Sequence, residues 1–367
     1  MCKYFLFFTL FVGSLFAESC DLSKLKILHL SFHRGCVGEI QGIGKALSLD
    51  ITSCSLIDKP REWLDGKSSG NAMYNIGHER ANAIWNKHRE FFDSFDVIIT
   101  SDTAPLSRVF LQNGWEKPLI IWICNRFDYS DVASLDCDFP DKAYYDLFRA
   151  ATKAPNVIMI GYTAYEHVYA KQKGIDTGGE TITPCGASQL LKKPFELSPS
   201  PSKKETFFLP PYHNEQIFMN LSRKCQELGI PNHCARYSDF RCLVGFKGVI
   251  HLPYAWSNFL FFENIALGLP YFVPSKEFQK ELSLQGDYFQ SYTPKGGDLF
   301  SQYAEWYSPE HASVITYFDS WEDLKMKIDG VDFSALSAAT KSYAEEYQKV
   351  MLGKWKIVFD KCCHMLQ

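Results

Sequence analysis

Long runs of Lys or Arg are missing from this chain of 367 residues, and its formal net charge is −4. Proteins that bind nucleic acids need a basic surface to displace counterions from phosphates, so we exclude nucleic acid as a partner. Charged residues make up 22% of the chain against 46% hydrophobic residues, a balance that excludes a disordered protein. The length is sufficient for two folded domains.

No Cys-x-x-Cys pair occurs among the 12 cysteines, and only Cys362 and Cys363 are adjacent. The common zinc-binding spacings are therefore excluded. If the N-terminal segment that contains Cys2 is removed, eleven cysteines remain, so at least one stays unpaired unless it forms an intermolecular bond. We expect no dense disulfide scaffold.

The N-terminus has the layout of a secretory signal, because Lys3 precedes an apolar run over residues 4–17. Residues 1–19 are interpreted as a signal peptide cleaved after Ala17. An uncleaved signal anchor remains the alternative, since a short run can cross a thin bilayer. These features predict the lumen of the secretory pathway, Golgi-like or ER-like, with membrane association if the anchor stays, and secretion as the alternative.

Strand and helix patterns alternate through the first half of the chain, over residues 24–190. We expect strands at 25–30, 96–100, 119–124 and 156–160, and helices at 39–47, 78–92, from about 105, at 141–152 and at 163–173. This alternation predicts a parallel sheet that is covered by helices on both faces.

The composition changes to Pro, Ser and Lys over residues 191–204, which we interpret as a linker. A second alternating series follows over residues 205–332. Its expected strands lie at 206–209, 248–252, 271–273 and 314–318, and its helices at 214–228 and 258–267. Residues 333–367 are expected to be helical and to pack back across the domains, with the apolar residues Tyr343, Tyr347, Met351 and Trp355 spaced by four.

Residues 248–275 form the most informative segment. An expected strand ends in a polar loop, Ser257 or Asn258 caps the following helix, and Gly268 ends it. The free N–H groups at the start of such a helix attract phosphate. Glu263 follows Phe262 within the helix, where an unpaired carboxylate would be costly, so it should have a partner.

This segment resembles the donor-site motif of GT-B glycosyltransferases, in which a polar loop leads to a helix with a Glu, followed by Gly, one residue, Pro and a strand. The resemblance implies an α/β fold of the GT-B type, with two Rossmann-like domains facing a cleft. It also implies that Glu263 binds the ribose of a nucleotide-sugar donor, and that Ser257 and Asn258 hold its diphosphate. Trp256 stands where many retaining members have a second acidic residue, which favours inversion.

Two further segments fit this resemblance. Residues 181–186, Thr-Ile-Thr-Pro-Cys-Gly, look like the Pro-x-Gly turn that closes the first domain in this family. The loop of residues 34–38, Arg-Gly-Cys-Val-Gly, corresponds to a glycine-containing loop that faces the cleft. The donor is a substrate, so no cofactor is expected.

Polar residues follow the strands of the first domain, where open parallel sheets bind ligands. His33 and Asp102 are the candidate general bases, since a base must deprotonate the acceptor hydroxyl. The candidate acceptor-binding residues are Arg34, Gly35, Asn125, Arg126 and Asp128. Three alternatives stay open: Asp102 as a helix cap, Arg126 with Asp128 as a local ion pair, and His33 as a surface residue.

A basic residue near the diphosphate would neutralise the charge of the leaving group without a metal. Lys247 and Arg241 precede the strand that leads to Ser257 and are the candidates. Solvated surface charge is the alternative for each. We therefore expect no metal in the site.

These features predict a transferase that moves a sugar from a nucleotide sugar to a glycan, lipid or protein acceptor. The alternative is a noncatalytic secreted glycan-binding protein with a GT-B-like fold. Nucleotide sugars occur in the lumen of the secretory pathway, which agrees with the predicted signal. Asn220-Leu221-Ser222 is a candidate glycosylation site there.

Overall fold

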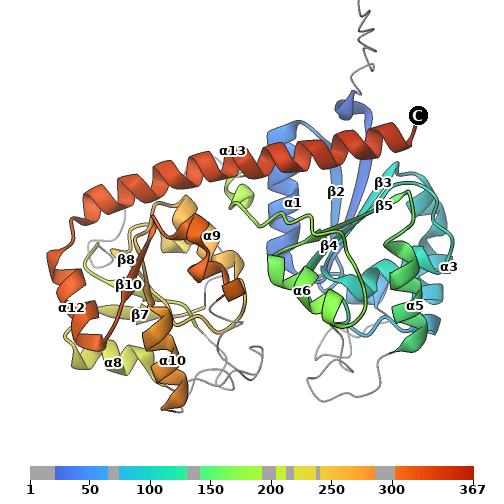
Figure 1. The fold of residues 1–367 in the computed structure, drawn as a ribbon. Helices are drawn as coiled ribbons and strands as arrows, with labels where there is room; N and C mark the ends of the chain where they lie inside the picture. The colour runs from blue at the N-terminus through green and yellow to red at the C-terminus, as the bar shows by residue number, and fades with distance from the viewer. Residues whose placement is uncertain are drawn as a thin grey trace, which may run out of the picture.

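The chain was analysed as a computed structural model that describes residues 21–64, 74–129, 141–191, 204–211, 219–236, 240–285 and 302–367. Two parallel sheets of five strands each organise it, in the orders β2-β1-β3-β4-β5 and β10-β9-β8-β6-β7 (Figure 1). Read from the opposite side, the second order is the same as the first, since β7 takes the place of β2 and β6 that of β1. The expected α/β fold with two Rossmann-like domains is confirmed.

The first sheet contains β1 (Lys26–Ser31), β2 (Asp50–Ser55), β3 (Val97–Thr103), β4 (Leu119–Asn125) and β5 (Val157–Gly161). The second contains β6 (Phe207–Leu209), β7 (Asn232–Cys234), β8 (Gly248–Ile250), β9 (Tyr271–Pro274) and β10 (Ile315–Phe318). The described helices are α1 (Arg34–Leu47), α2 (Pro60–Trp63), α3 (His78–Asp93), α4 (Arg108–Leu111), α5 (Lys142–Ala151), α6 (Ala164–Gln172), α8 (Leu221–Glu227), α9 (Phe259–Ala266), α10 (Lys276–Leu284), α12 (Trp321–Gly330) and α13 (Phe333–Met365).

Several expected elements differ from the observed ones. Helix α1 begins at Arg34, five residues before the expected start, because the His33 side chain caps it. The helix expected from about residue 105 is a 3-10 turn, η3 (Ala104–Ser107), followed by the short α4. Strands β2 and β7 and helices α10 and α12 were not expected, since their sequences mix polar and apolar residues. The linker of residues 191–204 and the signal segment lie almost wholly outside the described residues.

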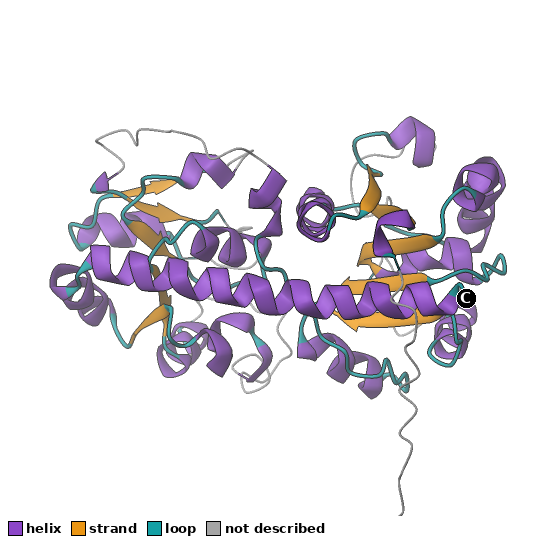
Figure 2. Cartoon of the chain, turned by 90° about the horizontal axis from the view of Figure 1, so that it is seen from above, coloured by secondary structure: helices purple, strands orange, loops and turns teal. Residues whose placement is uncertain are grey.

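Helix α13 runs along both domains as one continuous helix of 33 residues (Figure 2). It contacts α9 in the second domain and α1 in the first. Three members of its predicted apolar stripe, Tyr347, Met351 and Trp355, are buried. The stripe therefore serves packing, as its spacing indicated.

The cysteines agree with a sparse disulfide pattern. Cys363 is disulfide-bonded. Free thiols occur at Cys36, Cys54, Cys124, Cys185, Cys225, Cys234 and Cys362.

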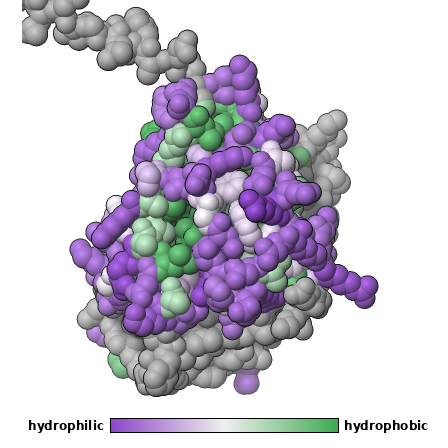
Figure 3. Space-filling model, turned by 90° about the vertical axis from the view of Figure 1, so that its right-hand side faces the viewer, coloured by the Kyte–Doolittle hydropathy of each residue, from purple (hydrophilic) through white to green (hydrophobic). Residues whose placement is uncertain are grey.

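Among the residues described, no helix is both long and apolar enough to cross a membrane. The face that Figure 3 shows, at the first-domain end, is mostly hydrophilic, and its hydrophobic residues lie in a narrow strip.

Candidate functional site

In each sheet, the order in which the chain adds strands reverses at one point, and this point is the same in both sheets. The strand order changes direction between β1 and β3 in the first sheet and between β6 and β8 in the second. Ligands of open parallel sheets bind at the carboxyl ends of the strands at such a switch point. His33 follows β1 and Asp102 lies in β3, so the two candidate bases flank the switch point of the first domain.

Asp102 has an unusual backbone and a shielded carboxylate. Its φ is 71°, in the left-handed region, and the pairing of β3 with β4 shifts register between Asp102 and Thr103. Such backbone geometry costs a non-glycine residue about 1–2 kcal/mol, although Asp and Asn tolerate it best. The side chain is 5% exposed and accepts a hydrogen bond of 2.8 Å from Asn125 Nδ2. Burial and the negative charge of the Cys36 sulfur raise the pKa of Asp102 to about 7.

This environment suits a general base, because a carboxylate with a pKa near neutrality can accept a proton and release it again. Asp102 does not cap a helix, as one alternative had it. Thr103 is the residue at the N-cap of η3, and no side chain caps that turn.

His33 caps α1 through its ring. Nδ1 accepts the Gly35 N–H at 3.0 Å, so a neutral ring has its proton on Nε2. Burial lowers the pKa of His33, but hydrogen bonding with Cys36 and the charges of Cys36, Asp102 and Glu263 outweigh it and raise the pKa to about 9, which favours the protonated ring. Nε2 carries a proton in both states. In this arrangement His33 can donate from Nε2 but cannot accept a proton there. A side chain at Gly35 would lie 2.7 Å from the His33 ring and 3.2 Å from Phe259. Glycine at this position is thus required for the His33 ring to cap the helix, and it leaves room for Phe259 of the second domain.

Aromatic residues join the carboxyl edges of the two sheets. Phe259, the first residue of α9, stacks on His33 with ring centroids 5.3 Å apart and meets Trp122 and Tyr162 edge to face. Trp256 stacks on Tyr165 of the first domain at 3.6 Å. Trp256 therefore packs across the domain interface.

The start of α9 is occupied by a carboxylate that the sequence did not reveal. Glu305, from the 3-10 turn η7 (Glu305–Tyr307), accepts hydrogen bonds from Ser257 Oγ and from the Asn258 N–H, the latter at 3.2 Å. The Asn258 side chain caps α9 by accepting the Leu260 N–H at 2.9 Å, which confirms the expected cap. Burial raises the pKa of Glu305 well above the usual range. A phosphate that used these groups would have to displace Glu305.

Glu263 lies half-buried on the side of α9 that faces the first domain. Burial and, with a smaller effect, the charge of Glu263 raise the pKa of Glu39 on α1 to about 7. The Glu39 carboxylate accepts the Cys185 N–H at 2.6 Å, and Gln189 Nε2 donates to the Glu263 carbonyl at 3.0 Å. The predicted ribose ligand is thus part of a polar contact between the domains.

A second polar cluster follows β4 and β5 in the first domain. Asp128 accepts hydrogen bonds from the hydroxyls of Tyr145 and Tyr169, the latter at 3.1 Å. Arg126 is buried and lies over the Tyr129 ring, with its Cζ 5.5 Å from the ring centroid. Asn125 stands apart from this cluster and contacts Asp102 instead.

Glu166 at the start of α6 belongs to the same cluster and was not foreseen. It is 4% exposed, and its Oε2 has no hydrogen-bond partner among the described residues. Burial raises the pKa of Glu166 to about 8, and the opposing effect of Arg126 is smaller. No motif in the sequence marks this residue, because it is one of several acidic residues on helices.

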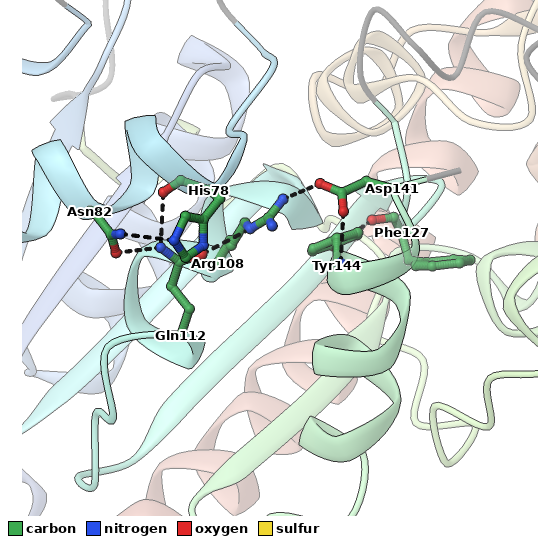
Figure 4. Close-up of polar contacts among 7 residues, drawn as sticks. All are labelled: His78, Asn82, Arg108, Gln112, Phe127, Asp141 and Tyr144. Atoms are coloured by element: carbon green, nitrogen blue, oxygen red, sulfur yellow. Dashed lines mark hydrogen bonds and ion pairs between the residues drawn. The ribbon is translucent and has the colours of Figure 1, made fainter. Parts of the chain in front are cut away.

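The buried guanidinium of Arg108 connects helices of the first domain. Arg108 donates from Nε to Gln112 at 2.9 Å and forms an ion pair with Asp141 (Figure 4). Gln112 in turn donates to the His78 carbonyl at 3.0 Å, and Asp141 caps α5 by accepting the Tyr144 N–H. This network holds α3, α4 and α5 together and is structural.

Two predicted binding residues, Arg34 and Lys247, lie away from the switch points. Arg34 is exposed and donates to Asp58 at 2.9 Å. Lys247 precedes β8, contacts Glu205 at 3.7 Å and lies over the Phe333 ring, which places its amine at the opposite edge of the sheet from Ser257. The side chain of Arg241 lies outside the described residues.

One acidic triplet in the sequence bears on the expected metal-free site. The chain contains one Asp-x-Asp triplet, Asp136-Cys137-Asp138, a pattern with which metal-dependent transferases bind cations, and it lies outside the described residues. Among the residues described, no cluster of His, Cys, Asp or Glu could hold a metal ion. Metal independence remains a prediction.

Comparisons with known proteins find similarity in fold. No protein-family model matches the chain, and no curated protein matches it in sequence. Among solved structures it resembles the T4 phage BGT in complex with UDP and Mn2+ (9% identity, 92% of this chain and 99% of that chain, TM-score 0.46). It also resembles a putative UDP-N-acetylglucosamine 2-epimerase from Listeria monocytogenes (12%, 88% and 91%, TM-score 0.45). A third is the glycosyltransferase SnogD from Streptomyces nogalater (9%, 88% and 95%, TM-score 0.41).

Proposed function

We propose that the protein is a nucleotide-sugar-dependent glycosyltransferase in which Asp102 is the general base. The observation that carries this proposal is the pairing of two Rossmann-like sheets whose carboxyl edges meet, with a shielded carboxylate at the switch point of one edge. The donor binds at the second domain and the acceptor at the first.

The proposed reaction depends on Asp102 at the carboxyl edge of the first sheet. Asp102 removes the proton of the acceptor hydroxyl as the hydroxyl oxygen attacks the anomeric carbon of the donor. The bond to the nucleoside diphosphate breaks, and the configuration at that carbon is inverted. His33 donates a hydrogen bond from Nε2 and does not act as the base, because its other nitrogen caps α1. Arg126, Asp128 and Glu166 contact the hydroxyl groups of the acceptor.

One observation favours a second candidate, a noncatalytic glycan-binding protein. Glu305 occupies the helix start that the resemblance assigns to the diphosphate, and its carboxyl group takes the Asn258 N–H that a phosphate would need. Under this alternative the second domain keeps the fold without binding a donor.

The decisive experiment titrates the full chain with uridine, guanosine, cytidine and adenosine diphosphates and follows the melting temperature and the heat of binding. A transferase binds at least one of them, and the bound ligand raises the melting temperature. The matching nucleotide sugars are then screened for release of the nucleoside diphosphate. Absence of binding to all four, with a folded protein, would favour the noncatalytic alternative.

A further inference from the structure

Two thiols meet at the same sheet edge as Asp102. Cys36 lies in the first turn of α1 and is fully buried, and Cys124 lies near the end of β4 and is half-buried. Their sulfur atoms are 3.8 Å apart, although 88 positions separate the two residues in the chain. Both are free thiols. The fold, and not local sequence, therefore brings them together.

We propose that Cys36 and Cys124 are a modification site, at which a low-molecular-mass disulfide such as glutathione disulfide forms a reversible intramolecular disulfide. The bond requires a sulfur-sulfur distance of about 2 Å, so the two sulfur atoms have to approach by only about 2 Å. The half-buried side chain of Cys124 provides access for the oxidant.

The reaction has two exchange steps. Burial and the neighbouring Cys36 raise the pKa of Cys124 well above its usual value, so the Cys124 proton passes to the adjacent Cys36 thiolate. The Cys124 sulfur attacks one sulfur of the oxidant, which releases a first thiolate, and this thiolate takes the proton from Cys36. Cys36 then attacks the Cys124 sulfur, which forms the internal disulfide and releases a second thiolate. The two protein thiols are oxidised, the S–S bond of the oxidant is reduced, and the two protons pass to the released thiolates.

The position of Cys36 favours the second step. A thiolate in the first turn of a helix is stabilised by the positive end of the helix dipole. Burial disfavours this thiolate, but hydrogen bonding from Cys124 and from His33 outweighs it and lowers the pKa of Cys36. Cys36 is therefore the sulfur that attacks the mixed disulfide.

The state of this pair bears on Asp102, and this consequence rests on the proposed function. The titratable and polar groups that face Asp102 are His33 and Cys36 from α1, and Cys124 and Asn125 from β4. Among them, a Cys36 thiolate raises the pKa of Asp102. Oxidation removes that charge, so Asp102 becomes easier to ionise. The acid side of the activity profile shifts to lower pH in the oxidised protein.

The site is tested on the full chain in glutathione buffers of graded oxidised-to-reduced ratio. Remaining thiols are alkylated, and peptides are quantified by mass spectrometry. The Cys36–Cys124 cross-link should increase with the oxidised fraction and disappear with dithiothreitol. Cys225, a fully buried thiol of α8, should stay reduced. Recovery of Cys36 and Cys124 as alkylated thiols at every ratio, or of Cys124 only as a glutathione adduct, would overturn the proposal.

Variants separate this site from other thiols. Cys36→Ser and Cys124→Ser should each abolish the cross-link, and Cys225→Ser should retain it. Because Cys36→Ser removes a buried sulfur beside Asp102, the Cys124→Ser variant keeps the test valid if the first variant does not fold. A disulfide between Cys36 and another cysteine in a folded Cys124→Ser variant, at the same glutathione ratios, would contradict the assignment of the pair.

A second measurement follows nucleotide-sugar turnover against pH in the oxidised and reduced protein. The acid side should lie at lower pH after oxidation, and Cys124→Ser, which cannot form the cross-link, should show no such shift. A cross-link without a shift would refute the coupling to Asp102 and uphold the modification site. Absence of turnover in every redox state would count against the proposed function instead, and the cross-link measurement would still decide the site.

Discussion

The two sheet edges that meet at the domain interface share one strand order but satisfy their polar groups differently. At the first edge, Asp102 is held beside the switch point and accepts a hydrogen bond from Asn125. At the second edge, Glu305 and the Asn258 side chain occupy the N–H groups at the start of α9. Strand order therefore determines where a ligand can bind, and the neighbouring side chains determine which charge is accepted there.

The largest expected effect tests the first edge. Asp102→Asn should lower turnover by about 10²–10⁴, the usual contribution of a positioned base, and leave nucleoside diphosphate affinity unchanged. Asn tolerates the left-handed backbone, so the fold should persist. In the unsubstituted protein the carboxylate is the active form, so turnover should decrease as the pH falls through about 7. The measurement is the release of nucleoside diphosphate against pH.

The stability of the same variant provides its control. The folded-state pKa of Asp102 lies above the unfolded value of about 4, so its neutral form is favoured by folding. Its ionisation therefore destabilises the fold as the pH rises from about 4 to 7. The unfolding free energy of Asp102→Asn at pH 8 should equal or exceed that of the unsubstituted protein. A lower value together with lost turnover would make Asp102 a structural residue.

The next effect concerns the interface between the edges. Glu263→Gln should weaken nucleoside diphosphate binding by about 1.5–3 kcal/mol, because a charge-assisted acceptor for the ribose hydroxyls is lost. Calorimetry gives the affinity, and the melting temperature should change little. A lower melting temperature with indirect loss of binding would show that the Glu263 side chain mainly serves the packing between the domains.

Glu305→Ala tests the contrast between the two sheet edges. The change removes the carboxyl group that takes the Ser257 hydroxyl and the Asn258 N–H, so both groups become available to phosphate. Nucleoside diphosphate should then bind roughly tenfold tighter, or ~1.4 kcal/mol. Glu310→Ala is the matched control, since this exposed residue follows in the next 3-10 turn. Weaker binding in the Glu305 variant alone would indicate that Glu305 positions the loop for the donor.

Local signals in the sequence were sufficient for the overall fold, and they were insufficient for the site. The Gly268 end and Asn258 cap of α9 follow from local rules and are observed. Glu305 and Glu166 could not be identified, because their burial depends on contacts between elements far apart in the chain. Lys247 was placed near the donor by its position before β8, but residues that precede a strand lie at the edge opposite to those that follow it.

The smallest expected effect concerns Arg34, which lies away from both sheet edges. Arg34→Ala removes an exposed ion pair with Asp58 and should change the unfolding free energy by less than about 1 kcal/mol. Turnover and diphosphate affinity should remain at their original values. An increase in the acceptor KM would instead support the acceptor-binding role that the sequence predicts for Arg34.

Helix α13 limits the ways in which the two edges can move against each other. The Ser337 hydroxyl donates to the Gly268 carbonyl at 2.6 Å in the second domain, and Trp355 packs edge to face on Trp122 in the first. A helix of this length spans about 50 Å and cannot stretch without breaking backbone hydrogen bonds. The two domains therefore cannot slide apart along the helix. Contacts with the two domains meet at Tyr347, whose hydroxyl pairs with Thr183 of the first domain and whose ring stacks on Phe262 of the second. Any change in the angle between the domains has to be accommodated around this residue.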